Sequence, residues 1–198
     1  MKSPERALWE RMWQTKSARF YASRRLKDTK KWVTRATSFA SVYLIIGALS
    51  PHVGVVELTP TEYSYWSIGI AGLSLIILVL SLLEHHRDYS VRAHRLHECG
   101  VRLNALYNEY DALFRSGTNI TLTQVQDYGK KYSDIVGEYS DVNHRPIDFR
   151  WFRAEHPDEF DLSKIRSNWM RATIWARIIG PYFAMVVLPP VAVLYLLL

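Results

Sequence analysis

The chain has 198 residues, 48% of them hydrophobic and 22% charged, and a formal net charge of +6 at pH 7. One cysteine excludes an intramolecular disulfide, and the absence of a phosphate-binding glycine loop, a nucleophile elbow or a dinucleotide fingerprint leaves an enzyme unsupported. Lys and Arg are dense up to Arg35 and then absent until Arg87. Cations confined to the flanks of a long apolar region are typical of a membrane protein.

Residues 1–35 are expected to form a basic amphipathic helix. In "RFYASRRLKDTKKW", residues 19–32, cations alternate with aromatic rings. Nucleic-acid binders use this pattern, and so do helices that lie on anionic lipid. Because the run leads directly into an apolar segment, we favour the membrane interface and disfavour nucleic acid as a partner. The predicted interfacial cations are Arg19, Arg24, Arg25, Lys27, Lys30 and Lys31.

Residues 36–83 are predicted to form a transmembrane helical hairpin with spans at 36–56 and 63–83. Neither span contains Asp, Glu, Lys or Arg, and each is long enough to cross a hydrocarbon core of about 30 Å. The link "ELTPTE" between them carries acids and no cation. The positive-inside rule therefore places the N-terminus and the region after Arg87 in the cytoplasm.

The second span carries a stripe of small residues on one helical face. Small side chains let helices approach closely, and their hydroxyls can bond across helices or line a water-filled path. Helix packing and a poorly selective pore both remain open as roles. The stripe consists of Ser64, Ser67, Ala71, Ser74 and Ser81.

Residues 84–172 are predicted to be a cytoplasmic helical region. We expect one long helix over 84–114, continuing from the second span, and a second helix that begins at a capping box from Thr121 to Gln124. Both carry apolar residues in alternating steps of three and four, as in coiled coils. The two seams either bury each other, receive the N-terminal helix, or contact further copies in a homo-oligomer. The seam residues are Leu96, Leu103, Leu106, Tyr110, Leu113, Tyr132, Ile135 and Tyr139.

Two charged runs are candidate chemical sites. The run "LLEHHRDYSVRAHRLHEC" lacks the ligand spacing of a metal site, so we expect a solvated helix and neither metal nor cofactor. The acids of "EHPDEFD" have no nucleophile to serve and are expected to cap the following helix. No catalytic residue is predicted.

The turn after the second seam is a candidate signal-receiving surface. It is rich in hydrogen-bonding groups, which suit recognition of a partner, although they serve equally to lock the helical bundle. The residues are Asn143, His144, Arg145, Asp148 and Phe149, followed by Trp151 and Phe152.

Residues 173–198 form a C-terminal hydrophobic segment. It lacks charge after Arg177 but contains Pro181, Pro189 and Pro190, which oppose a straight helix. We expect a kinked third span or a membrane anchor. The predicted fold class is therefore an all-α membrane protein with a transmembrane hairpin, a cytoplasmic helical hairpin and a third membrane segment.

Two motifs give the sequence a resemblance to a known family. "WQTKSARFYASRRL" before the hairpin and "YSDVNHRPIDF" after the seams resemble the SLATT superfamily over roughly residues 10–165. The residues that carry the likeness are Arg19, Phe20, Ala22, Arg25 and Leu26, with Asn143, His144, Asp148 and Phe149.

This resemblance implies an effector of an anti-phage system in the bacterial inner membrane. Such effectors are proposed to oligomerise and permeabilise the membrane on a signal from a nucleotidyltransferase, a nucleotide sensor or a reverse transcriptase. The competing hypotheses are a non-conducting scaffold that recruits a cytosolic enzyme, and a membrane tether for nucleic acid.

Overall fold

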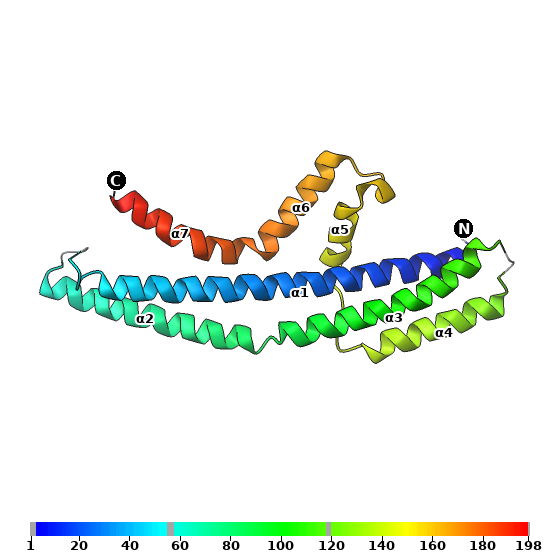
Figure 1. Cartoon of the computed structure of the whole chain (residues 1–198), viewed down its shortest axis with the longest axis horizontal. Coiled ribbons are helices and arrows are strands. Elements are labelled where there is room, and N and C mark those ends of the chain that lie inside the picture. Colours follow the sequence, from blue (N-terminus) through cyan, green and yellow to red (C-terminus); the bar gives the residue numbers. More distant parts are fainter. Residues whose placement is uncertain (1–2, 55–57, 118–119, 198) are drawn as a thin grey trace. The chain divides into compact units, whose positions relative to one another are not determined.

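The computed structural model describes residues 3–54, 58–117 and 120–197, and within these ranges the chain is helical without strands. Figure 1 shows the helices in chain order. They are α1 (Pro4–Leu49), α2 (Pro60–His85), α3 (Tyr89–Arg115), α4 (Leu122–Glu138), α5 (Pro146–Glu155), a 3-10 helix (Pro157–Phe160), α6 (Lys164–Ile178) and α7 (Gly180–Leu197).

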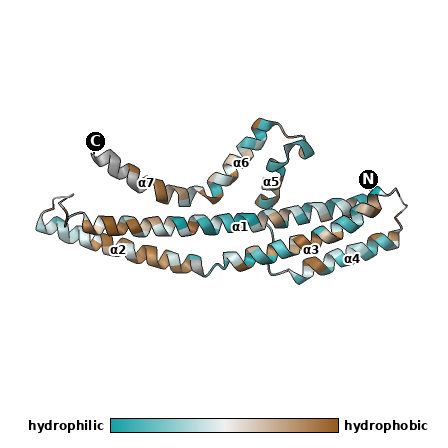
Figure 2. Ribbon diagram, in the orientation of Figure 1, coloured by the Kyte–Doolittle hydropathy of each residue, from teal (hydrophilic) through white to brown (hydrophobic). Residues whose placement is uncertain are grey.

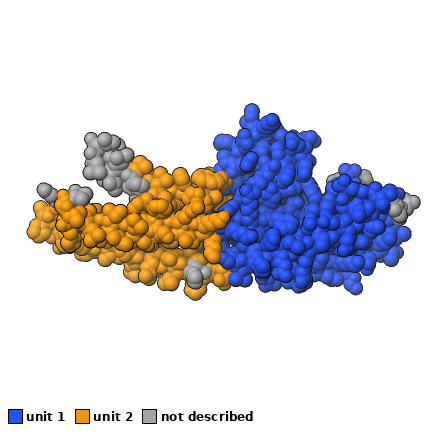
Figure 3. All heavy atoms as spheres, viewed as in Figure 1, with its two compact units in different colours: residues 1–28, 89–174 blue, residues 29–88, 175–198 orange. Residues whose placement is uncertain are grey.

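The chain forms two compact units (Figure 3). Unit 1 comprises residues 1–28 and 89–174, and unit 2 comprises residues 29–88 and 175–198. Helix α1 contributes to both units and runs without a break through the boundary expected at residue 35. The basic segment and the first apolar segment are therefore parts of one helix.

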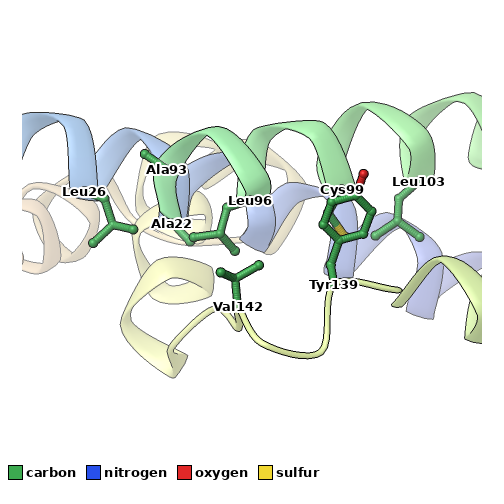
Figure 4. Close-up of a cluster of buried hydrophobic side chains, with 8 residues drawn as sticks. All are labelled: Ala22, Leu26, Ala93, Leu96, Cys99, Leu103, Tyr139 and Val142. Atoms are coloured by element: carbon green, nitrogen blue, oxygen red, sulfur yellow. The ribbon is translucent and has the colours of Figure 1, made fainter. Parts of the chain in front are cut away.

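The core of unit 1 contains the predicted seams. Helices α3 and α4 lie side by side as an antiparallel hairpin, and the N-terminal part of α1 packs onto them (Figure 1). In Figure 4, Ala22 and Leu26 of α1 meet α3 and the turn that follows α4. The seam is thus covered within the chain. Its buried members are Leu96, Leu103, Leu106, Tyr110 and Tyr139, and its half-buried members are Leu113, Tyr132 and Ile135.

Local signals set the ends of two of these helices. The capping box of α4 is present as predicted: the Gln124 backbone N–H donates to Thr121 Oγ1 at 3.3 Å, and the Thr121 N–H donates to Gln124 Oε1 at 2.9 Å. The continuous helix expected from the second span into residues 84–114 is wrong. The chain breaks between His85 and Tyr89, where Asp88 has a φ of 43°.

Unit 2 contains the apolar segments. By length and composition α1 and the stretch that begins with α2 can cross a membrane, and Figure 2 shows hydrophobic residues along α2 and the second half of α1. The Trp66 indole donates to the Gly47 carbonyl at 3.0 Å. A side chain at Gly47 would lie 3.1 Å from Ile70, so glycine permits this close approach.

The first predicted span, 36–56, is shorter as a helix than expected. Helix α1 ends at Leu49, residues 50–54 form turns that include Pro51, and residues 55–57 lie outside the described ranges. The second predicted span, 63–83, lies wholly within α2.

The C-terminal segment is bent, but not where most of its prolines lie. Helices α6 and α7 meet at Ile179 with a bend of 65°. Pro181 occupies the first turn of α7, where the missing N–H costs no hydrogen bond. The helix then continues to Leu197, so the backbone accommodates the Pro189–Pro190 pair that we expected to oppose it. The Tyr43 hydroxyl of α1 donates to the Val186 carbonyl of α7 at 2.7 Å.

Candidate functional site

A buried ion pair joins α1 to α5 within unit 1. Arg25 Nε donates to Asp148 Oδ1 at 2.6 Å, and Arg25 Nη2 donates to Oδ2 at 3.2 Å. Asp148 is 0% exposed, and Oδ2 also accepts the Arg145 backbone N–H at 2.7 Å. Pro146 starts α5, so the carboxylate lies in the first helical turn, where the helix dipole favours negative charge. The bidentate geometry offsets the cost of removing both charges from water.

A second buried cation, Arg19, lies beside this pair. Its Nη1 donates to the carbonyl oxygen of Val142, in the turn after α4. The same turn is closed by Asn143, whose Oδ1 accepts the His144 backbone N–H at 2.9 Å. Burial, followed by the charge of Arg19, lowers the pKa of His144, and Asp148 only partly opposes this. The imidazole is therefore neutral at physiological pH.

Glu155, at the end of α5, binds two further polar side chains of α1. Its carboxylate accepts the Tyr21 hydroxyl at 2.8 Å and Arg24 Nη1 at 2.9 and 3.1 Å. Trp151 Nε1 donates to the same carboxylate at 2.9 Å. Burial, and then the Glu155 hydrogen bond and charge, raise the pKa of Tyr21 far above its ordinary value.

These contacts form one connected feature, which we call the polar lock. It holds α5 and the turn before it against the N-terminal part of α1. Two of its cations and one of its carboxylates are buried, so breaking the polar lock would separate charges that pair away from water. Its members are Arg19, Tyr21, Arg24, Arg25, the Val142 carbonyl, Asp148 and Glu155.

The polar lock corrects the interfacial assignment of two predicted cations. Arg19 and Arg25 are buried inside unit 1 and are not available to lipid headgroups, because each is bound to an oxygen of residues 142–148. Arg24 is exposed but paired with Glu155. The side chains of Lys27, Lys30 and Lys31 are exposed.

The predicted signal-receiving surface is divided. Asp148 is buried in the polar lock and is not a surface residue, because Arg25 and the Arg145 N–H enclose it. Asn143 and Arg145 are exposed, and His144 is half-buried. Phe149 is half-buried and packs on Phe152 and Phe160, with ring centroids 5.9 and 6.0 Å apart.

Sequence reasoning missed the role of Glu155. The acids of "EHPDEFD" were expected to cap the next helix, but the hydroxyl of Ser163 accepts the N–H of Arg166 at 3.3 Å at the start of α6. Trp151 and Glu155 lie four residues apart on one helical face, and this spacing is a local signal for the hydrogen bond between them. It gives no signal for the contacts of Glu155 with Tyr21 and Arg24.

The stripe residues on α2 stay largely on the surface of the single chain. Ser67, Ala71 and Ser81 are exposed, as is Ser64, whereas Ser74 is half-buried. The hydroxyl of Ser64 donates to the Pro60 carbonyl at 3.2 Å, and that of Ser74 to the Ile70 carbonyl at 2.7 Å. Helix α2 meets α1 through Trp66 and Ile70 on a neighbouring face.

The histidine-rich run, residues 82–99, covers the end of α2, the break before α3 and the first part of α3. Residue Cys99 is buried, and burial raises the pKa of its thiol. His97 packs edge-on against Phe20, with ring centroids 5.5 Å apart. In the described part of the chain, no group of three or more His, Cys, Asp or Glu side chains is placed to hold a metal ion.

The described residues form only helices, and two of these helices, or three if the bent pair α6–α7 is one span, are long and apolar enough to cross a membrane. The sequence profile of the SMODS and SLOG-associating 2TM effector domain family 5 matches residues 1–196, and the chain belongs to this family. The resemblance to the SLATT superfamily is confirmed, and the chain is a membrane effector of the kind found in defence systems. No curated protein and no solved structure matches it.

Proposed function

We propose that the protein is an effector of the bacterial inner membrane that oligomerises and lets ions leak when a partner signals infection. The observation that carries this proposal is the exposed small-residue stripe of α2 in a chain that belongs to a family of two-transmembrane effectors. Two or three apolar helices are too few to enclose a water-filled path, so a leak requires several copies.

The stripe supports assembly because its small side chains lie among large exposed apolar side chains of α2. Around it α2 exposes large apolar side chains such as Ile68 and Leu75, which suit lipid. The small residues Ser67 and Ala71 instead permit a second helix to approach closely. We propose that a homo-oligomer packs along the stripe and that the hydroxyls line the path in the active state.

The charge pattern supports a cytoplasmic position for unit 1. The exposed Lys30, Lys31 and Arg35 precede the apolar part of α1, whereas Glu57 and Glu62 lie in or beside the link between the apolar segments. The positive-inside rule assigns the first group to the cytoplasm and the link to the opposite side.

The polar lock supplies the element that a signal would act on. Asn143 and Arg145 are exposed on the turn that carries the buried Asp148 contact, so a partner bound there acts directly on the lock. We propose as partner a nucleotidyltransferase, a nucleotide sensor or a reverse transcriptase. The nucleic-acid tether loses support, because Arg19 and Arg25 are buried.

Neighbouring substitutions on α2 test the proposal. Ala71→Leu and Ser67→Leu replace small side chains of the stripe by a large one. Gly72→Leu adds the same large side chain on another face of α2, where a Cβ meets nothing within 4 Å. In cells with the activated partner, both stripe variants should lose toxicity while remaining in the membrane fraction, and Gly72→Leu should stay toxic. Equal toxicity of all three variants would contradict the stripe as the path and favour the scaffold.

A further inference from the structure

Helix α6 exposes an apolar face that none of the described residues covers. Ile165 is 84% exposed and Trp169 is 71% exposed. Ala172 and Ala176 are also exposed, and the steps of four, three and four place all four side chains on one stripe of the helix. An indole and an isoleucine this exposed are unfavourable in water.

Cations border this apolar face on both sides. At 100° per residue, Arg166 and Arg177 lie along one edge of the stripe, and Lys164 and Arg171 lie along the other. All four side chains are exposed, and residues 164–178 contain no Asp or Glu. By contrast, the polar helix α4 exposes both signs of charge, for example Asp127 and Lys131.

The opposite face of α6 is fixed to the protein. Ser167 is buried, and its hydroxyl donates to the Ala154 carbonyl of α5 at 2.5 Å. Ile174 is also buried. The exposed stripe therefore has a defined outward direction.

We propose that α6 lies on an anionic bilayer surface, with Ile165 and Trp169 inserted between acyl chains and the flanking cations at phospholipid phosphates. An apolar stripe bordered by Lys and Arg, with a tryptophan at its centre, has the chemistry of an interfacial helix. Four cations oppose crossing of the hydrocarbon. The apolar helix α7 follows after one residue and supplies continuity with the membrane. This inference goes beyond the proposed leak and does not depend on it.

Site-directed fluorescence in the full chain tests this assignment. Trp169→Cys is labelled with an NBD maleimide and reconstituted into phosphatidylcholine vesicles with or without phosphatidylglycerol. Asp134→Cys, an exposed position on α4, is the matched control. The native Cys99 is buried and its thiol pKa is raised, so it contributes little labelling.

Acyl-chain nitroxide lipids should quench the label at position 169 roughly twofold more than the label at 134 when phosphatidylglycerol is present. Arg166→Gln combined with Arg171→Gln should reduce that quenching, whereas Lys130→Gln with Lys131→Gln should not. Equal quenching at 169 and 134, or equal quenching at 169 in the two lipid compositions, would overturn the proposal. A label at 169 that is shielded from aqueous iodide but not quenched by nitroxide lipid would also overturn it, in favour of a second copy.

Discussion

The two units differ in where they place charged and large apolar side chains. Unit 1 places Arg19, Arg25 and Asp148 in its interior, each bound to a specific partner. Unit 2 leaves large apolar side chains on its surface, such as Leu75 at 64% exposure, whereas Leu103 of unit 1 is 0% exposed. The contrast supports different surroundings: water around the bundle of α3, α4 and the N-terminal part of α1 in unit 1, and lipid around the apolar part of unit 2.

The largest expected effect lies in the polar lock. Asp148→Ala leaves the Arg25 guanidinium buried without its carboxylate and should lower the unfolding free energy of unit 1 by about 3–5 kcal/mol. Glu138→Ala removes an exposed partner of Arg102 and should cost about 0–1 kcal/mol. Hydrogen exchange of α3 in nanodiscs measures both, and equal protection in the two variants would contradict a stabilising lock.

Replacing one leucine by alanine in each unit tests whether large apolar side chains are packed inside unit 1 and exposed in unit 2. Leu103→Ala opens a cavity in the core of unit 1 and should cost about 2–5 kcal/mol. Leu75→Ala removes a side chain that faces outward in unit 2, where acyl chains fill the space, so its cost should lie within about 0.5 kcal/mol. Denaturant unfolding of the full chain in nanodiscs measures both values. A large cost at Leu75 would show that a protein surface covers it.

Substitution by alanine should change the stability of unit 1 in opposite directions at two of its glycines. A Cβ at Gly100 would lie 3.1–3.2 Å from the Phe20 ring, so Gly100→Ala should destabilise the contact of α1 with α3 by about 1–3 kcal/mol. A Cβ at Gly129 of α4 meets nothing within 4 Å, and Gly129→Ala should stabilise by about 0.5–1 kcal/mol. Thermal unfolding measures the two shifts, and stabilisation by both would refute the close packing at Phe20.

The smallest expected effect is the pH dependence of the stability of unit 1 that His144 causes. The folded pKa of His144 lies below its ordinary value, so the unfolded chain binds more protons, and unit 1 loses stability as pH falls below about 6.5. In His144→Gln this contribution is absent. We expect the midpoint of thermal unfolding to drop less between pH 7.5 and 5.5 in the variant than in the parent protein. An identical drop would exclude His144 as a contributor.

Short sequence patterns correctly predicted the buried faces of α3 and α4 and the start of α4, because neighbouring residues determine these features. The steps of three and four located the seam residues such as Leu96 and Leu103, and the Thr121 capping box located the start of α4. The break before α3 was missed, because Asp88 at a φ of 43° follows helix-forming residues without a glycine or proline to mark it.

The polar lock was not predictable in full, because its partners are far apart in sequence. Arg25 and Asp148 are 123 residues apart, and the cation-rich run around Arg25 resembles an exposed interfacial helix when it is considered alone. The motif around Asp148 was recognised as either a receiving surface or a lock. Only the fold shows that this carboxylate is enclosed.

Membrane potential tests the central claim most directly. Bacteria expressing the protein at a controlled level, with and without its genomic neighbours, are loaded with a potential-sensitive dye. The proposal predicts depolarisation only when the activated partner is present, and its loss in Ala71→Leu but not in Gly72→Leu. A steady potential under confirmed expression and activation would contradict the leak and favour a non-conducting scaffold.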